Sequence, residues 1–113
     1  MDYSRKRRSN RIPLEIPIYI RVQKGGALEE EEAQTRVISR YGAMVVSRQD
    51  LMIGDEFQLA MVASGQVARA HVVWRKKSWP SRAWQMGVEI MGQDNFWGLH
   101  WSPPLGQGVP GSA

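Results

Sequence analysis

The stretch from Arg11 to Val22 alternates between aliphatic and other side chains, and it constrains the fold more than any other part of the chain. The aliphatic residues all share one parity: Ile12, Leu14, Ile16, Ile18, Ile20 and Val22. Successive side chains of a β-strand point to opposite sides, so a period of two is typical of a strand with one buried face. We therefore expect a single strand along this whole stretch.

Five more extended stretches follow this strand, separated by short turns that contain glycine. They cover or lead into residues 35–39, 43–47, 57–61, 67–75 and 84–90. Six strands joined by such turns predict an all-β fold, either an antiparallel barrel or a sandwich. The acidic run Glu29–Glu32 is expected to be a solvated loop. Asp94 is expected to cap a short turn whose aromatic side chains, Phe96 and Trp97, close one end of a barrel.

The positive charge of the chain is concentrated at its N-terminus. The formal net charge is +4, while the residues after Arg11 carry equal numbers of acidic and basic side chains. Residues 1–11 are therefore expected to form a flexible basic arm that captures an anion. Residues 12–101 are expected to form one folded domain, and residues 102–113, which have no core-forming content, a disordered tail.

Composition excludes several classes of function. The chain has no cysteine, so disulfides, thiolate catalysis and cysteine-based metal sites are excluded. No apolar run reaches the ~18 residues of a membrane helix, and no signal peptide is recognisable, so we expect a soluble, cytoplasmic protein. His71 and His100 have no neighbouring nucleophile or acid, so we interpret them as structural residues and expect no metal site. We expect that the protein is not an enzyme and has no cofactor.

Two short segments carry the candidate binding chemistry. Arg7 and Arg11 are four residues apart, which puts both side chains on one face of the chain, with Arg8 between them. The planar guanidinium of arginine suits phosphate and guanine, because it can donate two hydrogen bonds at once and stack on a ring. The second segment is the turn Ser39–Gly42, where glycine permits a positive φ and close approach of a ligand, and the Ser39 hydroxyl can donate and accept.

With these two segments the chain resembles the PilZ domain family. Arg7-Arg8-Ser9-Asn10-Arg11 matches the family's RxxxR motif, and Ser39-Arg40-Tyr41-Gly42 matches the SxxG part of its D/N-x-S-x-x-G motif. Similarity continues through Leu51-x-x-Gly54-Asp55, Val72-Val73-Trp74 and Met86-Gly87-Val88-Glu89, and it spans Arg7 to Trp101. The resemblance implies a six-stranded antiparallel β-barrel of the split-barrel type that binds the bacterial second messenger cyclic di-GMP. It assigns the ligand to Arg7, Arg8, Arg11, Ser39 and Gly42.

One position departs from the family pattern. Val37 stands where the motif has Asp or Asn, and its side chain can neither accept from nor donate to a guanine edge. This change is expected to weaken binding by ~1–3 kcal/mol. Two hypotheses therefore stay open: a cyclic di-GMP receptor that orders its arm on the ligand and signals to a protein partner, or a PilZ-type protein-interaction module that no longer binds the ligand. A β-barrel that binds nucleic acid is a third, less favoured hypothesis.

A further cationic surface is expected in the loop between the last two strands. Its residues are Arg75, Lys76, Lys77, Trp79 and Arg82. Four cations and an aromatic side chain so close together are typical of a docking surface for a partner protein or single-stranded nucleic acid. The alternative is a solvated hairpin loop with Trp79 folded onto the barrel.

Overall fold

The computed structural model describes residues 11–78 and 80–99. These residues form seven strands: β1 (Ile12–Pro13), β2 (Pro17–Lys24), β3 (Ala27–Ser39), β4 (Gly42–Ser47), β5 (Glu56–Met61), β6 (Val67–Lys77) and β7 (Trp84–Met91). Apart from Arg11, the expected arm lies outside the described residues, as do the expected tail, Trp79 and His100. Their expected roles, and the domain boundaries drawn from them, stay predictions.

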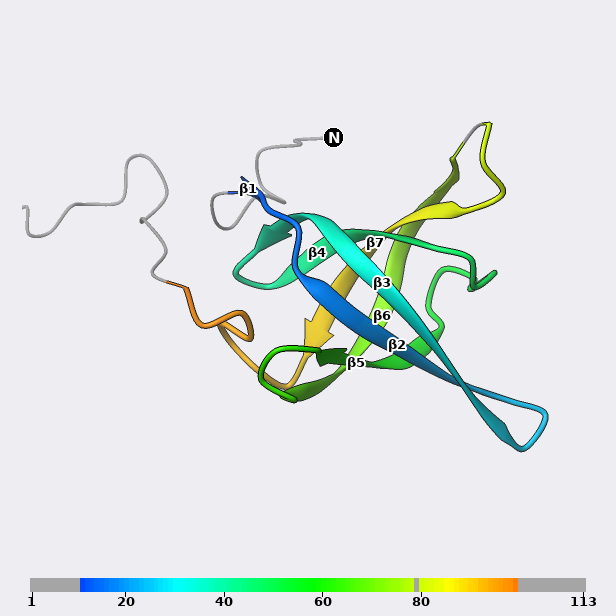
Figure 1. Cartoon of the computed structure of the whole chain (residues 1–113), viewed down its shortest axis with the longest axis horizontal. Helices are drawn as coiled ribbons and strands as arrows, with labels where there is room; N and C mark the ends of the chain where they lie inside the picture. The colour runs from blue at the N-terminus through cyan, green and yellow to red at the C-terminus, as the bar shows by residue number, and fades with distance from the viewer. Residues whose placement is uncertain (1–10, 79, 100–113) are drawn as a thin grey trace, which may run out of the picture.

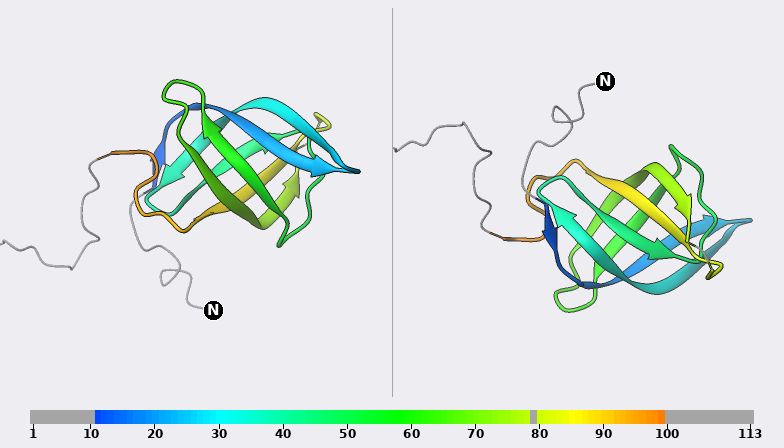
Figure 2. Two further views of the ribbon diagram at one scale, coloured as in Figure 1. Left: turned by 90° about the horizontal axis from the view of Figure 1, so that it is seen from below. Right: turned by 90° about the horizontal axis from the view of Figure 1, so that it is seen from above.

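The six longer strands form a closed antiparallel barrel (Figure 1). The order of neighbours is β3-β2-β5-β6-β7-β4, and a further pairing between β3 and β4 closes the ring. Figure 2 shows the strands crossing obliquely around this barrel. The short strand β1 adds to β3. The all-β, six-stranded antiparallel barrel expected from the sequence is confirmed.

The N-terminal alternation forms two strands, β1 and β2, and not the single strand expected. Both pair with β3, and between them the regular pairing is interrupted, although the Leu14 amide still donates to the Arg36 carbonyl and the Thr35 amide to the Ile16 carbonyl. The Thr35 hydroxyl donates to the Leu14 carbonyl at 2.7 Å and accepts from the Ile16 amide at 2.9 Å. Pro13 and Pro17 have no N–H and cannot donate hydrogen bonds to the ladder, which interrupts it here. The Thr35 side chain satisfies the Leu14 carbonyl and the Ile16 amide at this break.

The acidic run Glu29–Glu32 was expected to be a solvated loop, but it is part of β3. It pairs with β2 in the long hairpin that projects from the barrel (Figure 1). Arg21 of β2 forms an ion pair with Glu30 at 2.7 Å, and Lys24 lies 3.9 Å from Glu29. The basic side chains of β2 thus supply the opposite charges, across the strand pair, that make an acidic strand stable.

The apolar parity of each strand faces the barrel interior. Its largest fully buried members are Ile18, Ile20, Ile38, Val45, Leu59, Val72 and Met86. Phe96 and Trp97, which follow β7, are buried in the same core and contact each other edge to face, with 5.1 Å between ring centroids. The two aromatic side chains therefore belong to the core of the barrel.

The carboxylate of Asp94 interacts with the backbone of Asn95, in the turn that Asp94 was expected to cap, but its stronger contact is to a residue outside that turn. This carboxylate pairs with Arg40, in the turn between β3 and β4. The side chain of Asn95 accepts from the Leu99 amide at 3.2 Å and donates to the Leu99 carbonyl at 2.9 Å. The segment after β7 is thereby held against the β3–β4 turn, which contains the predicted binding residues.

Candidate functional site

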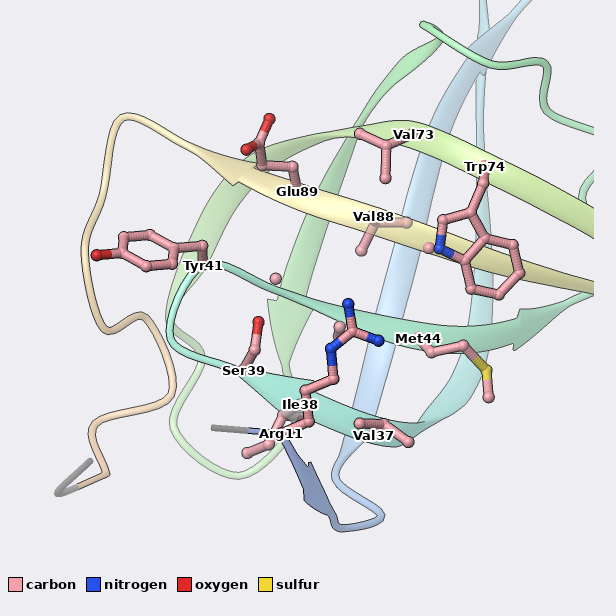
Figure 3. Close-up of a pocket in the computed structure, with 13 residues that line it drawn as sticks. Arg11, Val37, Ile38, Ser39, Tyr41, Met44, Val73, Trp74, Val88 and Glu89 are labelled. Carbon is pink, nitrogen blue, oxygen red and sulfur yellow. The ribbon is translucent and has the colours of Figure 1, made fainter. Parts of the chain in front are cut away.

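A pocket of about 280 Å³ lies on the outer face of the barrel, over β3, β4, β7 and β6 (Figure 3). Arg11, just before β1, extends its guanidinium into the middle of this pocket. Polar side chains gather toward one end: Ser39, Tyr41 and Glu89. Apolar side chains gather toward the other end: Val37, Met44 and Trp74. The pocket therefore has a cationic centre between a polar end and an apolar end.

Three of the five residues assigned to the ligand line this one pocket: Arg11, Ser39 and Gly42. Val37, at the position that departs from the motif, also lines it. Arg7 and Arg8 lie outside the described residues. The fold thus brings together residues that are distant in sequence, while their role in binding stays a prediction.

Gly42 is needed at its position for a reason other than the one expected. Its φ is not positive, unlike that of several turn glycines in the described part of the chain. A Cβ atom on Gly42 would lie 2.1 Å from the Val88 carbonyl oxygen and 3.3 Å from the Glu89 Cα. Backbone atoms cannot move aside cheaply, so the close packing of β4 on β7 requires glycine here.

The turn Ser39–Gly42 is held in place from outside the β3–β4 pair. Arg40 donates two hydrogen bonds to Asp94, at 2.7 and 3.0 Å, and these bonds lower the pKa of the Asp94 carboxyl and raise the pKa of Arg40. The indole N–H of Trp97 donates to the Gly42 carbonyl at 3.1 Å. The Ile90 amide donates to the Tyr41 carbonyl at 2.8 Å. The turn therefore has a fixed geometry at the edge of the pocket.

Trp74 forms an aromatic wall that the sequence analysis did not assign to the site. Val73 is an extra residue in β6 relative to β7, and this bulge leaves both Val73 and Trp74 on the exposed face. The indole of Trp74 lies on Gly87, where a Cβ atom would meet its Nε1 at 1.9 Å. The residue remains 41% exposed. The pairing of Trp74 with Gly87 across two strands could have indicated the aromatic wall, but the bulge that aligns these residues cannot be seen in the sequence.

Glu89 is the acidic residue that lines the pocket, and it too was not assigned to the site from the sequence. Its carboxylate lies 3.2 Å from Nε2 of His71, its cross-strand partner on β6. The other ring nitrogen, Nδ1, is buried and has no hydrogen-bond partner among the described residues. His71 has a structural contact, as expected, but with a residue of the pocket.

The docking surface predicted for one loop is wrong in its structure: Arg75, Lys76 and Lys77 belong to strand β6, and Arg82 lies between β6 and β7. These side chains also have different surroundings. Arg75 donates to Asp50 at 2.5 Å and to the Leu51 carbonyl at 3.0 Å, and its guanidinium lies 4.0 Å from the Trp84 ring centroid. Lys77 lies over the same ring at 4.6 Å. Lys76 is exposed, and Arg82 lines a second pocket beside Arg48. A role in partner binding stays a prediction for these cations and for Trp79.

The first pocket combines groups that suit an anion attached to a planar ring. A guanidinium binds phosphate through charge-assisted hydrogen bonds, and an exposed indole offers a face on which an aromatic ring stacks. The Ser39 hydroxyl and the Glu89 carboxylate add hydrogen-bonding groups at the polar end. A nucleotide has both of the required parts.

Comparison with known proteins agrees with this geometry. The model of the PilZ domain matches residues 5–95, which include both motif segments and the whole pocket. No curated protein matches the chain. Within the described residues, no helix has the length and apolar character to cross a membrane. PilZ domains are ligand-binding or adaptor domains. The match covers most of the sequence and agrees with the closed barrel, and the chain therefore belongs to the PilZ domain family.

Proposed function

We propose that this protein is a cytoplasmic receptor for cyclic di-GMP, in which the basic arm orders on the bound ligand and the complex signals to a partner protein. Membership of a family generally linked to this ligand supports the proposal. The observation that carries it is the pocket in which Arg11, Ser39 and Gly42 meet. In this proposal Arg7, Arg8 and Arg11 bind phosphate and guanine, and the Ser39–Gly42 turn contacts a guanine edge.

The aromatic wall of the pocket, formed by Trp74, suits the chemistry of this ligand. Cyclic di-GMP has two guanine rings and two phosphates, so it needs both stacking surfaces and cations. Trp74, which lies against Gly87 and is partly exposed, provides a stacking surface. Arg11 provides a cation within the same pocket.

Val37 is the observation that favours the alternative, a PilZ-type interaction module without the ligand. It brings an aliphatic side chain to the pocket at a position where the motif supplies a hydrogen-bonding group. An unpaired guanine edge costs about 1–3 kcal/mol, or roughly 5- to 150-fold in affinity. Such a loss weakens binding without removing the other contacts, so the receptor remains the better-supported function.

The test is calorimetric titration of the full chain with cyclic di-GMP, with GTP as a control nucleotide. We expect saturable binding of cyclic di-GMP and no comparable binding of GTP. The Arg11→Ala variant should lose about 1.5–3 kcal/mol of binding free energy, because a charge-assisted contact to phosphate or guanine is removed.

Arg48→Ala is the matched control, because it removes the same charge at the far end of β4, outside the pocket. Its affinity should equal that of the wild type. Equal affinities for Arg11→Ala and Arg48→Ala would contradict the assignment of Arg11. Absence of any binding to cyclic di-GMP would leave the interaction-module hypothesis in its place.

A further inference from the structure

Glu89 stands out in a pocket proposed to hold a doubly charged anion. Among the described residues that line the pocket, it is the only acidic one. Its side chain is 56% exposed. A carboxylate beside a phosphate weakens binding through like-charge repulsion unless the ligand offers it hydrogen-bond donors. We therefore expect the part of the ligand opposite the Glu89 carboxylate to carry hydrogen-bond donors.

The carboxylate of Glu89 contacts a neighbouring side chain, and this contact leaves it able to accept hydrogen bonds from a ligand. One oxygen, Oε1, lies 3.2 Å from Nε2 of His71 on β6. On the strand side, Glu89 pairs with Gly42 of β4, the glycine of the proposed binding turn. In Figure 3 the carboxylate extends from β7 on the same face as Val73 and Trp74. It thus lies beside the binding turn, at the end of the pocket opposite Trp74.

The chemistry of the bases identifies the matching donor group. A carboxylate only accepts hydrogen bonds, through two oxygens side by side. The Watson–Crick edge of guanine presents two adjacent donors, N1–H and the 2-amino group. Adenine presents an acceptor at N1 and has no 2-amino group. Val37, which stands at the motif position for a guanine-binding Asp or Asn, cannot accept.

We propose that Glu89 is the specificity-determining residue of this pocket: its carboxylate, at the polar end beside Ser39 and Gly42, accepts hydrogen bonds from the N1–H and 2-amino groups of a guanine, which Val37 at the apolar end cannot do. This inference rests on the proposed function. In this proposal Arg11 and Trp74 can contact any purine nucleotide, whereas Glu89 makes the pocket selective for guanine over hypoxanthine and adenine. The carboxylate that repels phosphate is then the group that selects the base.

Titration with three cyclic dinucleotides tests the inference. Cyclic di-IMP retains N1–H but lacks the 2-amino group, and cyclic di-AMP lacks both donors. The wild type should prefer cyclic di-GMP over cyclic di-IMP by roughly 10- to 100-fold, and over cyclic di-AMP by more. Glu89→Gln should bind cyclic di-GMP roughly 10- to 100-fold more weakly and lose most of this preference, because its amide N–H₂ opposes the guanine donors.

Two further variants separate direct contact from charge. Glu89→Asp keeps the charge but shortens the side chain by one methylene, so it should also lose preference for guanine. Glu29→Gln removes the same charge on the β2–β3 hairpin, away from the pocket, and should behave as the wild type.

The remaining outcomes distinguish a failure of this inference from a failure of the proposed function. If the wild type binds none of the three dinucleotides, the proposed function is wrong and this inference falls with it. If the wild type binds cyclic di-GMP and Glu89→Gln keeps the same preference, the function stands and the inference is overturned. It is also overturned if Glu89→Gln tightens all three ligands equally, or if Glu89→Asp retains the full preference, because the carboxylate would then act only through its charge.

Discussion

Val37 brings no hydrogen-bonding atom to the pocket that it lines. Replacing it with aspartate restores the group found in the family motif. We expect Val37→Asp to bind cyclic di-GMP more tightly by about 1–3 kcal/mol, because a previously unpaired guanine edge gains an acceptor. Isothermal titration of the variant and the wild type measures the difference directly.

Val67→Asp is the control for this substitution, because Val67 is also a partly exposed strand valine and lies outside the pocket. It introduces the same charge and should leave affinity unchanged. If Val37→Asp and Val67→Asp both bind as the wild type does, position 37 makes no contact with the ligand. The estimated penalty for valine would then be wrong.

Individual residues of the site differ in how far the sequence could identify them. Arg11, Ser39 and Gly42 lie in short motifs, so their roles could be proposed from local spacing. Trp74 and Glu89 could not be assigned in this way, because their positions depend on the β6–β7 register and on the bulge at Val73. A one-residue shift in that register would turn these side chains to the other face.

At the scale of strands, the break between β1 and β2 depends on one buried hydroxyl. Thr35 is completely buried, and its side chain bonds both the Leu14 carbonyl and the Ile16 amide. Thr35→Val keeps the shape but leaves these two backbone groups without their partner. We expect it to lower the free energy of unfolding by about 1–3 kcal/mol, as measured by urea denaturation.

Thr35→Ser is the informative comparison, because it keeps the hydroxyl and loses only a methyl group. It should be less destabilised than Thr35→Val if the hydrogen bonds matter more than packing. The opposite order would mean that the methyl group dominates at this position. In that case the backbone groups near the break must find other partners, such as water.

The strands themselves were largely predictable, and the errors have local causes. Alternation located β4 to β7 closely, because each buries one face in a shared core. It merged β1 and β2 into one strand, since the Thr35 contact that marks the break between them joins segments distant in sequence. The acidic run was misjudged for the same reason: the counter-charges of Glu29 and Glu30 lie across the hairpin, on β2.

At the scale of the whole molecule, the proposed function makes a prediction for the basic arm. If Arg7 and Arg8 contact the ligand as proposed, the amides of residues 1–10 should exchange more slowly with solvent when cyclic di-GMP is bound. Hydrogen–deuterium exchange followed by mass spectrometry measures this change peptide by peptide. The tip of the β2–β3 hairpin, residues 24–26, is an internal control and should exchange equally in both states.

Unchanged exchange of residues 1–10 in a ligand-saturated sample would separate the two parts of the proposal. Binding would stand, but ordering of the arm as the signal would be wrong. Repeating the measurement with Arg11→Ala at saturating ligand shows whether the arm depends on this arginine.

The segment after β7 has a consequence for how forces travel through the protein. Trp97 bonds the Gly42 carbonyl and Asp94 bonds Arg40, so the chain leaving the barrel is fastened directly to the loop beside the pocket. Tension applied beyond Leu99, by a fused module or an attached protein, would reach that loop without first deforming a strand. Conversely, a ligand that shifted the loop would pull on the exit of the polypeptide by two routes, through the Arg40–Asp94 pair at the surface and through Trp97 in the core.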